Sequence, residues 1–194
     1  MFYRFIRMLV NFIYTILFRL KTEGTENIPA TGPVILCANH ISVLDPPTVG
    51  IRIKRPVKFM AKEELFAKPI LGVIIRNLGA FPVKRGGVSK ESIKHTLTIL
   101  REGNVLGIFP EGTTKGTTGG MGKKGVASFA LKTGAAVVPV AIIGKYKLFQ
   151  QVVVKYGKPV DLSEFDSGSS EDLELATEKI MAVIRAMIAE HQRK

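Results

Sequence analysis

Uninterrupted apolar runs bounded by glycine, proline and polar residues are the feature that most constrains the fold of this chain. The longest run is 136–143, and shorter ones occupy 34–38 and 105–109. Strands that lie buried on both faces are continuously apolar, and they occur in parallel sheets that helices cover on both sides. The sequence therefore predicts an α/β fold with a mixed, largely parallel sheet flanked by helices.

The segments between these runs supply the remaining elements. We expect further strands at 57–61, 79–83 and 151–156, and helices at 89–102, 126–133 and from Ser169 onward. Ser89 and Ser169 are suited to cap their helices. Pro139 requires an edge or an irregularity within its strand, because it lacks a backbone N–H. Since neither a repeat nor an interdomain linker is evident, residues 21–194 are expected to form a single domain.

The strand at 34–38 leads into a pair of residues suited to acid–base chemistry. His40 leaves the carboxyl end of this strand, which is where open α/β sheets place their sites. If a turn or a helix start follows, Asp45 returns to the imidazole, fixes its tautomer and leaves the other ring nitrogen as a base. Such a base deprotonates a hydroxyl without Ser, Cys or a metal. The alternative is that both residues serve turns and caps.

The charge of the chain limits its expected binding partners, and its cysteine content indicates its redox compartment. The chain carries 28 Lys and Arg against 16 Asp and Glu, a formal charge of +12, which suits nucleic acid, an anionic membrane or a phosphorylated ligand. With no Trp and 4 Tyr, base stacking is not favoured, so no nucleic-acid partner is expected. The single cysteine, Cys37, excludes an internal disulfide and fits a reducing compartment. Inside an apolar strand it is expected to be a small buried hydrophobe rather than an acyl relay.

Residues 2–20 are expected to form an amphipathic helix. A helix places the polar residues on one stripe and leaves the rest of its surface apolar; the stripe consists of Arg4, Arg7, Asn11, Thr15 and Arg19. The apolar stretch is too short to span a bilayer, and no small-residue cleavage site of a signal peptide follows it. We therefore expect 1–20 to be a membrane-interface helix whose arginines face anionic headgroups. The alternative is a helix packed on the domain.

Four sequence blocks together resemble the glycerolipid acyltransferases that acylate 1-acylglycerol-3-phosphate. The blocks are Asn39-His40…Asp45-Pro46, Lys62-Glu63…Pro69…Gly79…Phe81…Arg85, Phe109-Pro110-Glu111-Gly112-Thr113 and Val138-Pro139-Val140. The His-x4-Asp block alone is weak evidence, but the four blocks in this order are specific. The resemblance runs from about Lys21 to Tyr156, and the N-terminal helix is similar to that family's interfacial anchor.

This resemblance implies a reaction and its participants. His40 is the general base that deprotonates the free glycerol hydroxyl of lysophosphatidic acid, and Asp45 orients it. The hydroxyl attacks the thioester of acyl-CoA or acyl-carrier protein, and phosphatidic acid forms without a cofactor, a metal or a covalent acyl-enzyme. The resemblance also implies a set of acceptor-binding positions: Lys62, Arg85, Glu111, Gly112, Thr113, Lys115 and Pro139. A lipid acceptor, together with the amphipathic helix at 2–20, predicts a peripheral or monotopic protein on the cytoplasmic face of the cell membrane.

One departure from the family pattern leaves the acceptor open. The family commonly has Arg after Glu-Gly-Thr, whereas this chain has Thr114 followed by Lys115. A guanidinium binds phosphate through two hydrogen bonds, which a hydroxyl or an ammonium does not reproduce. Lys115 substitutes for it, or Arg85 and the pair 123–124 contribute more, or the acceptor is another lysophospholipid. A rival of a different class is a non-enzymatic basic protein that binds anionic membranes.

Overall fold

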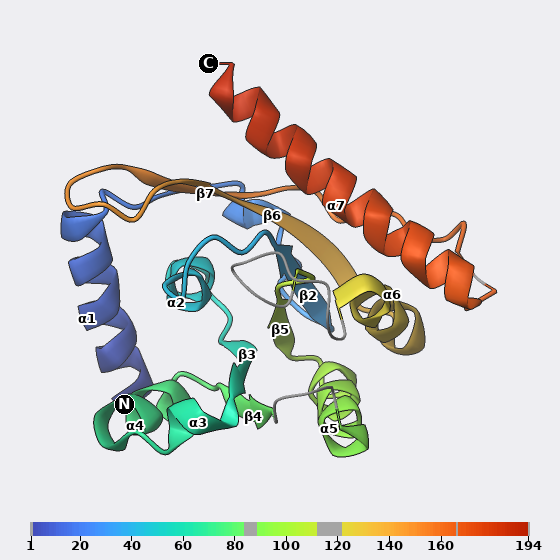
Figure 1. Cartoon of the computed structure of the whole chain (residues 1–194), viewed down its shortest axis with the longest axis horizontal. Coiled ribbons are helices and arrows are strands. Elements are labelled where there is room, and N and C mark those ends of the chain that lie inside the picture. The colour runs from blue at the N-terminus through green and yellow to red at the C-terminus, as the bar shows by residue number, and fades with distance from the viewer. Residues whose placement is uncertain (1, 84–88, 112–121, 166, 194) are drawn as a thin grey trace.

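A single mixed sheet organises the chain (Figure 1). The computed structural model describes residues 2–83, 89–111, 122–165 and 167–193. Within them seven strands run in the order β1-β7-β6-β2-β5-β3-β4. Their bounds are β1 Lys21–Glu23, β2 Val34–Ala38, β3 Val57–Lys62, β4 Phe81–Val83, β5 Val105–Ile108, β6 Ala136–Gly144 and β7 Val152–Tyr156. The pairs from β6 to β4 are all parallel, while β7 runs antiparallel to β6 and carries β1 parallel to itself. The predicted mixed, largely parallel sheet is confirmed.

The sheet separates two apolar cores because successive side chains of a strand point to opposite faces. In the central strand β2, Val34 and Leu36 face one core while Ile35 and Cys37 face the other. All four are fully buried. The continuous apolar runs of the sequence follow from this burial on both faces.

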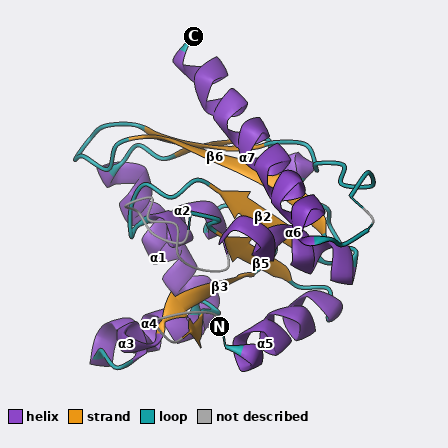
Figure 2. Cartoon of the chain, turned by 45° about the vertical axis from the view of Figure 1, so that its right-hand side comes forward, coloured by secondary structure: helices purple, strands orange, loops and turns teal. Residues whose placement is uncertain are grey.

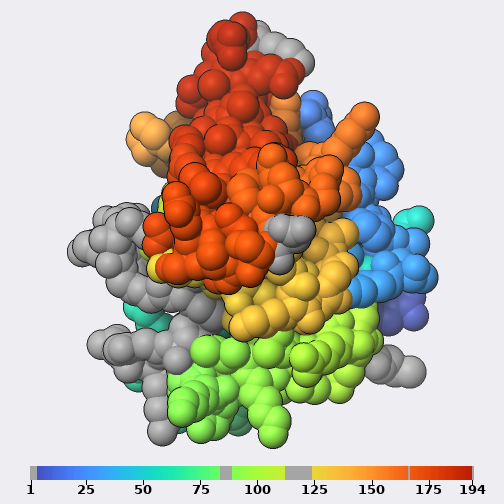
Figure 3. Space-filling view, turned by 90° about the vertical axis from the view of Figure 1, so that its right-hand side faces the viewer, coloured from blue at the N-terminus to red at the C-terminus, as the bar shows by residue number. Residues whose placement is uncertain are grey.

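Three helices cover one face: α5 (Lys90–Arg101), α6 (Gly122–Thr133) and α7 (Ser170–Gln192). Figure 2 shows these helices beside the sheet, and Figure 3 shows the outer surface that they form. The expected caps are present, since Ser89 accepts from the backbone N–H of Ser92 and Ser169 accepts from that of Asp172. Ile99 of α5, Phe129 of α6 and Ile180 of α7 contribute buried side chains to the shared core.

The other face is covered by α1 (Phe2–Leu17) and α2 (Asp45–Gly50), while α3 (Glu63–Phe66) and α4 (Pro69–Asn77) lie near the start of α1 (Figure 1). Tyr14 and Phe18, at the end of α1, are buried in the core on this face. Two backbone hydrogen bonds, from Phe149 to Leu17 and from Val152 to Phe18, fasten this end to the β6–β7 connection. The short helix η1 (Thr25–Asn27) follows β1.

The middle of the polar stripe of α1 faces the domain, so Arg7 does not face headgroups as expected, whereas the expectation for Arg4 and Arg19 stays a prediction. Arg7 donates to the carbonyl oxygens of Ile51, at 2.7 Å, and Ile53, just beyond the end of α2. Arg52 donates to Asn11 and Thr15 of the same stripe. The carbonyls past a helix end lack helical partners, and the guanidinium of Arg7 satisfies those of Ile51 and Ile53. Arg4 and Arg19 remain exposed.

With Arg7 turned toward the domain, many apolar side chains of α1 are exposed on the surface of the molecule. Its exposed apolar side chains are Phe5, Met8, Leu9, Phe12, Ile13 and Ile16, with Met8 64% and Phe12 63% exposed. In the described residues, no helix combines the length and the apolar character that crossing a membrane requires.

The pairing of β6 with β7 is interrupted at Pro139, as expected from its missing N–H. The β6–β7 ladder extends from Gly144 only as far as Val140, opposite Tyr156. At Pro139 the carbonyl oxygen accepts from Gly157, and the next contact on this side is the bridge between Val137 and Val160. The proline therefore occupies a break in the ladder, where no N–H is required.

Candidate active site

His40 and Asp45 meet at the carboxyl end of β2. The Nδ1 atom of His40 lies 2.7 Å from Oδ2 of Asp45. A turn in which the Asp45 N–H donates to the Ser42 carbonyl brings the two side chains together, and α2 then begins at Asp45 itself. An ionised carboxylate on Nδ1 selects the tautomer with its proton there, which leaves Nε2 as a base. The predicted spacing therefore produces the predicted pairing; the catalytic role stays a prediction.

Asp45 is held by its surroundings as well as by the imidazole. Its carboxylate is fully buried. Besides His40, Oδ2 accepts from the backbone N–H groups of Ile41 and Ser42, at 2.7 and 2.8 Å. A buried carboxylate needs hydrogen-bond donors in place of the water it has lost, and these groups supply them. Asp45 can therefore supply a fixed negative charge beside the imidazole.

Stacked rings fix the plane of the His40 side chain. Phe109 stacks on His40 with ring centroids 4.3 Å apart, and Phe59 stacks behind Phe109 at 6.0 Å. Gly107 makes room for this stack, since a Cβ there would lie 2.0 Å from the Phe59 ring. The backbone N–H of His40 donates to Oε2 of Glu111, which follows the neighbouring strand β5. Glu111 thus holds the backbone of His40, while its predicted contact with the acceptor stays untested.

Two polar residues to which the sequence analysis gave no role, Tyr146 and Asn39, complete the site. The Tyr146 hydroxyl lies 2.7 Å from Oδ1 of Asp45 and 2.9 Å from the hydroxyl of Thr48. Asn39 bridges to β6, where its amide exchanges two hydrogen bonds with the backbone of Ile142. No local pattern identifies these partners, because each lies about a hundred positions away along the chain.

The predicted acceptor-binding positions divide into described and undescribed residues. Lys62 ends β3 and is exposed at the same edge of the sheet as His40. Arg85, Gly112, Thr113 and Lys115 lie outside the described residues. Each of these assignments remains a prediction.

Two further residues considered for the acceptor or acyl group lie on the opposite face of the sheet. Pro139 is buried, and its ring lies beside Gly157 and Met187 of α7, so it does not line the dyad. Cys37 is fully buried, and burial, with the charge of Glu111, raises the pKa of its thiol. A protonated buried thiol is a poor nucleophile. Of the pair 123–124 considered for phosphate binding, Lys124 forms an ion pair with Glu174 of α7 at 2.9 Å. The side chain of residue 123 is not described.

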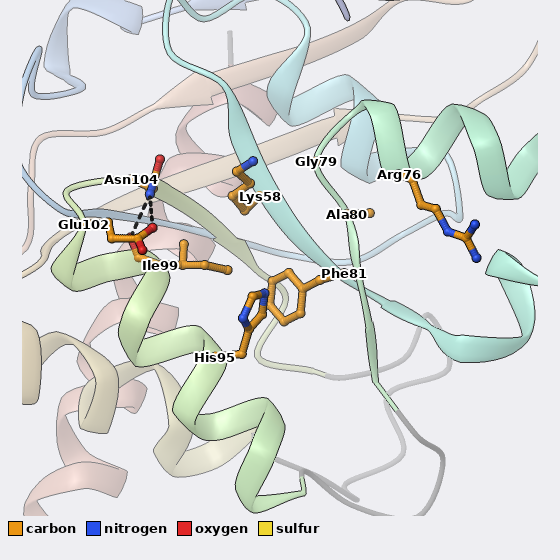
Figure 4. Close-up of a pocket in the computed structure, with 9 residues that line it drawn as sticks. All are labelled: Lys58, Arg76, Gly79, Ala80, Phe81, His95, Ile99, Glu102 and Asn104. Carbon is orange, nitrogen blue, oxygen red and sulfur yellow. Dashed lines mark hydrogen bonds between the residues drawn. The ribbon is translucent and has the colours of Figure 1, made fainter.

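A hollow of about 400 Å³ lies at the other end of the strands and is separate from the dyad (Figure 4). Its walls include Lys58 near the start of β3, Ala80 before β4 and Asn104 before β5. These positions mark the amino ends of the parallel strands, opposite the edge that carries His40. Within the described ranges, no group of three His, Cys, Asp or Glu side chains is placed to hold a metal ion.

Comparison with known proteins gives this arrangement a family. The acyltransferase family model matches residues 19–143. The 1-acyl-sn-glycerol-3-phosphate acyltransferase of Bacillus subtilis is 30% identical over 192 residues, which cover 95% of this chain and 96% of that protein. The chloroplastic enzyme of the same name from Arabidopsis thaliana is 34% identical over 135 residues, covering 68% of this chain and 38% of the relative.

A solved structure shares the fold. The crystal structure of the 1-acyl-sn-glycerophosphate acyltransferase PlsC from Thermotoga maritima superposes with a TM-score of 0.76 at 27% identity, covering 99% of this chain and 80% of that chain. The range matched by the family model includes His40, Asp45 and Glu111, which the structure joins at the carboxyl ends of β2 and β5. This chain therefore belongs to the acyltransferase family.

Proposed function

We propose that this protein transfers an acyl group from an acyl thioester to the free hydroxyl of 1-acylglycerol-3-phosphate and so forms phosphatidic acid. The observation that carries the proposal is the contact of 2.7 Å between His40 Nδ1 and Asp45 Oδ2, which leaves Nε2 available as a base. The names of the Bacillus subtilis and Thermotoga maritima relatives support the acceptor.

The dyad supports a direct transfer. Nε2 of His40 takes the proton of the acceptor hydroxyl as its oxygen attacks the thioester carbonyl. The carbon–sulfur bond then breaks, and the departing thiolate takes the proton back from the imidazolium. Asp45 stabilises the imidazolium that exists between these steps. Each proton and bond is accounted for without a covalent acyl-enzyme.

Membrane contact is the second part of the proposal. The acceptor is a lipid, so the dyad must meet the bilayer surface. The outward apolar face of α1, defined by Phe5, Met8, Leu9, Phe12, Ile13 and Ile16, supports such contact, since exposed apolar surface of this extent marks an interaction site. Ile41 and Val43, beside the dyad, are also exposed, Val43 by 82%. The protein is thus proposed to lie on the cytoplasmic face of the cell membrane as a peripheral or monotopic protein.

The acceptor headgroup and the acyl donor are the finer parts of the proposal. Lys62, exposed beside the dyad edge, is proposed to attract the phosphate as a point charge. Acyl-CoA and acyl-carrier protein are both proposed donors, because either thioester presents the same carbonyl to the acceptor hydroxyl.

An acceptor panel tests the function. Purified protein, anionic vesicles and labelled acyl-CoA or acyl-carrier protein are combined with lysophosphatidic acid, or with lysophospholipids whose phosphate carries choline, ethanolamine or glycerol. Labelled phosphatidic acid as the main product is the expected result. Preferred acylation of another lysophospholipid would reassign the acceptor, while no product with either donor would contradict the proposed enzyme.

A further inference from the structure

Tyr146 touches the proposed machinery from a distant part of the chain. It lies in the connection between β6 and β7, and its ring is partly buried. The hydroxyl lies within hydrogen-bond distance of Asp45 Oδ1 and of Thr48. A phenol has one proton to donate, and a carboxylate is the stronger acceptor. The Tyr146 hydroxyl is therefore assigned as the donor to Asp45 Oδ1. The hydroxyl of Thr48 donates to the carbonyl of Leu44 at 2.8 Å.

The two oxygens of Asp45 are held from different places. Oδ2 takes its donors from His40, Ile41 and Ser42, all within five positions of Asp45. Among the described residues, the hydrogen bond to Oδ1 comes from Tyr146. The final torsion of an Asp side chain is broad, and rotation about it moves both oxygens together. A hydrogen bond to Oδ1 therefore adds a restraint on this torsion that also keeps Oδ2 on the imidazole. A donor at the second oxygen fixes that plane against the imidazole.

Tyr146 is itself held by the end of α1. Phe18 meets its ring edge-on, with centroids 5.2 Å apart and planes at 88°, and Tyr14 meets Phe18 in the same way at 5.3 Å. Burial, and then the charge of Asp45, raises the pKa of Tyr146. The phenol therefore keeps its proton at neutral pH and remains a donor.

We propose that Tyr146 is a positioning residue that fixes the carboxylate plane of Asp45 against His40 and is itself aligned by Phe18, which directly follows α1. The inference rests on the proposed function for its kinetic consequence, since alignment of the dyad matters to the rate only if His40 is the base. Its structural consequence, the geometry of the His40–Asp45 hydrogen bond, is independent of any substrate.

Tyr146→Phe removes the hydroxyl and keeps the ring. Turnover (kcat) should fall about 10-fold, the equivalent of one hydrogen bond to a charged group, while KM for lysophosphatidic acid stays unchanged.

Tyr156→Phe is the matched control. Tyr156 is a buried tyrosine on the same face, and its hydroxyl donates to the Val49 carbonyl at 2.7 Å. Loss of this hydroxyl should lower the free energy of unfolding without changing kcat. An unchanged kcat in Tyr146→Phe, or an equal fall in both variants at temperatures where both are folded, would overturn the inference.

A spectroscopic readout keeps the test independent of turnover. The chain has 3 histidines, so the His40 ring proton on Nδ1 can be assigned by comparison with His40→Ala in the NMR spectrum of ¹⁵N-histidine protein. Its resonance should shift or broaden in Tyr146→Phe and remain in place in Tyr156→Phe. An unchanged resonance would contradict the inference even if the acceptor panel succeeds. Failure of the acceptor panel together with a shifted resonance would instead reject only the proposed function.

Discussion

The helices on the two faces of the sheet differ in which side chains they turn toward the core. On one face, α5 and α7 begin at serine caps and turn apolar side chains such as Ile99 and Ile180 into the core. On the other face, α1 turns Arg7 inward to backbone carbonyls and leaves Phe12 outside. The first arrangement is typical of a helix in water, whereas the second suits apolar surroundings. His40 and Asp45 lie on the side of α1, so the proposed catalytic dyad and the exposed apolar surface share one side of the molecule.

The buried residues at the end of α1 change how a deletion of this helix should be interpreted. Tyr14, Phe18 and Leu20 are buried in the core beneath the sheet face. Truncating residues 1–20 would therefore expose that core and release Tyr146 in addition to removing membrane contact. Substitutions confined to the outward face separate the two effects.

The largest expected effect comes from His40→Ala. Loss of a general base should lower kcat by about 10²–10⁴-fold, with the fold retained because His40 is at the edge of the site. His95→Ala is the matched control on the other side of the sheet, since His95 is exposed on α5 and contacts Phe81. Initial rates with labelled acyl thioester measure both. A His40→Ala protein that keeps more than a tenth of the wild-type rate would remove His40 from the chemistry.

Asp45→Asn should have the next largest effect. The amide lacks the charge that stabilises the imidazolium. Both oxygens of Asp45 accept hydrogen bonds, whereas one end of the amide is an NH₂ group that would meet another donor. We expect kcat to fall by at least about 10-fold and the free energy of unfolding by ~1–3 kcal/mol. Urea titration followed by circular dichroism measures the second quantity. A stability loss without a change in kcat would make Asp45 purely structural.

Polar substitution on the outward face of α1 tests the apolar side of the comparison. The variant Phe5→Gln, Met8→Gln, Phe12→Gln keeps good helix formers in the helix and removes three exposed apolar side chains. Each is worth up to ~2 kcal/mol when buried in lipid, so the bound fraction in vesicle flotation should fall by more than about 10-fold. Leu175→Gln, on an exposed position of α7, should float like the wild type. Equal flotation of the triple variant and the wild type would mean that this face does not bind lipid.

The smallest effect is expected from Cys37→Ala. The thiol faces the α5–α7 side and has no contact with the dyad, so kcat should stay within a factor of about two. The small cavity should reduce the free energy of unfolding by ~1 kcal/mol or less. Intact-mass spectrometry after incubation with the acyl thioester checks the same point, because an acyl group trapped on Cys37 would refute the direct transfer.

Features set by local chemistry could be predicted from the sequence, and those set by distant partners could not. The strand at 34–38 and the cap at Ser89 follow from apolar runs and neighbouring backbone groups. The contact between His40 and Asp45 follows from their spacing. The direction in which α1 turns its stripe depends on carbonyls more than 40 positions away, because an apolar helix surface does not reveal whether protein or lipid covers it.

Residues brought together only by the completed sheet escaped prediction. Tyr146 follows an apolar strand between two lysines and carries no mark of a site, yet it reaches Asp45 once β6 is placed beside β2. Pro139 shows the converse, since it belongs to a block of the family resemblance but packs beside Gly157 on the α7 side.

The rate ratio between two forms of the acceptor tests most directly the claim that chemistry and lipid contact share one side. Lysophosphatidic acid is offered either in anionic vesicles or as a short-chain monomer below its critical micelle concentration. For the triple variant of α1, the account predicts a vesicle-to-monomer rate ratio that falls about 10-fold from wild type, with the monomer rate kept. The ratio of Leu175→Gln should not change. A triple variant with the wild-type ratio, or one that loses both rates equally, would contradict the account.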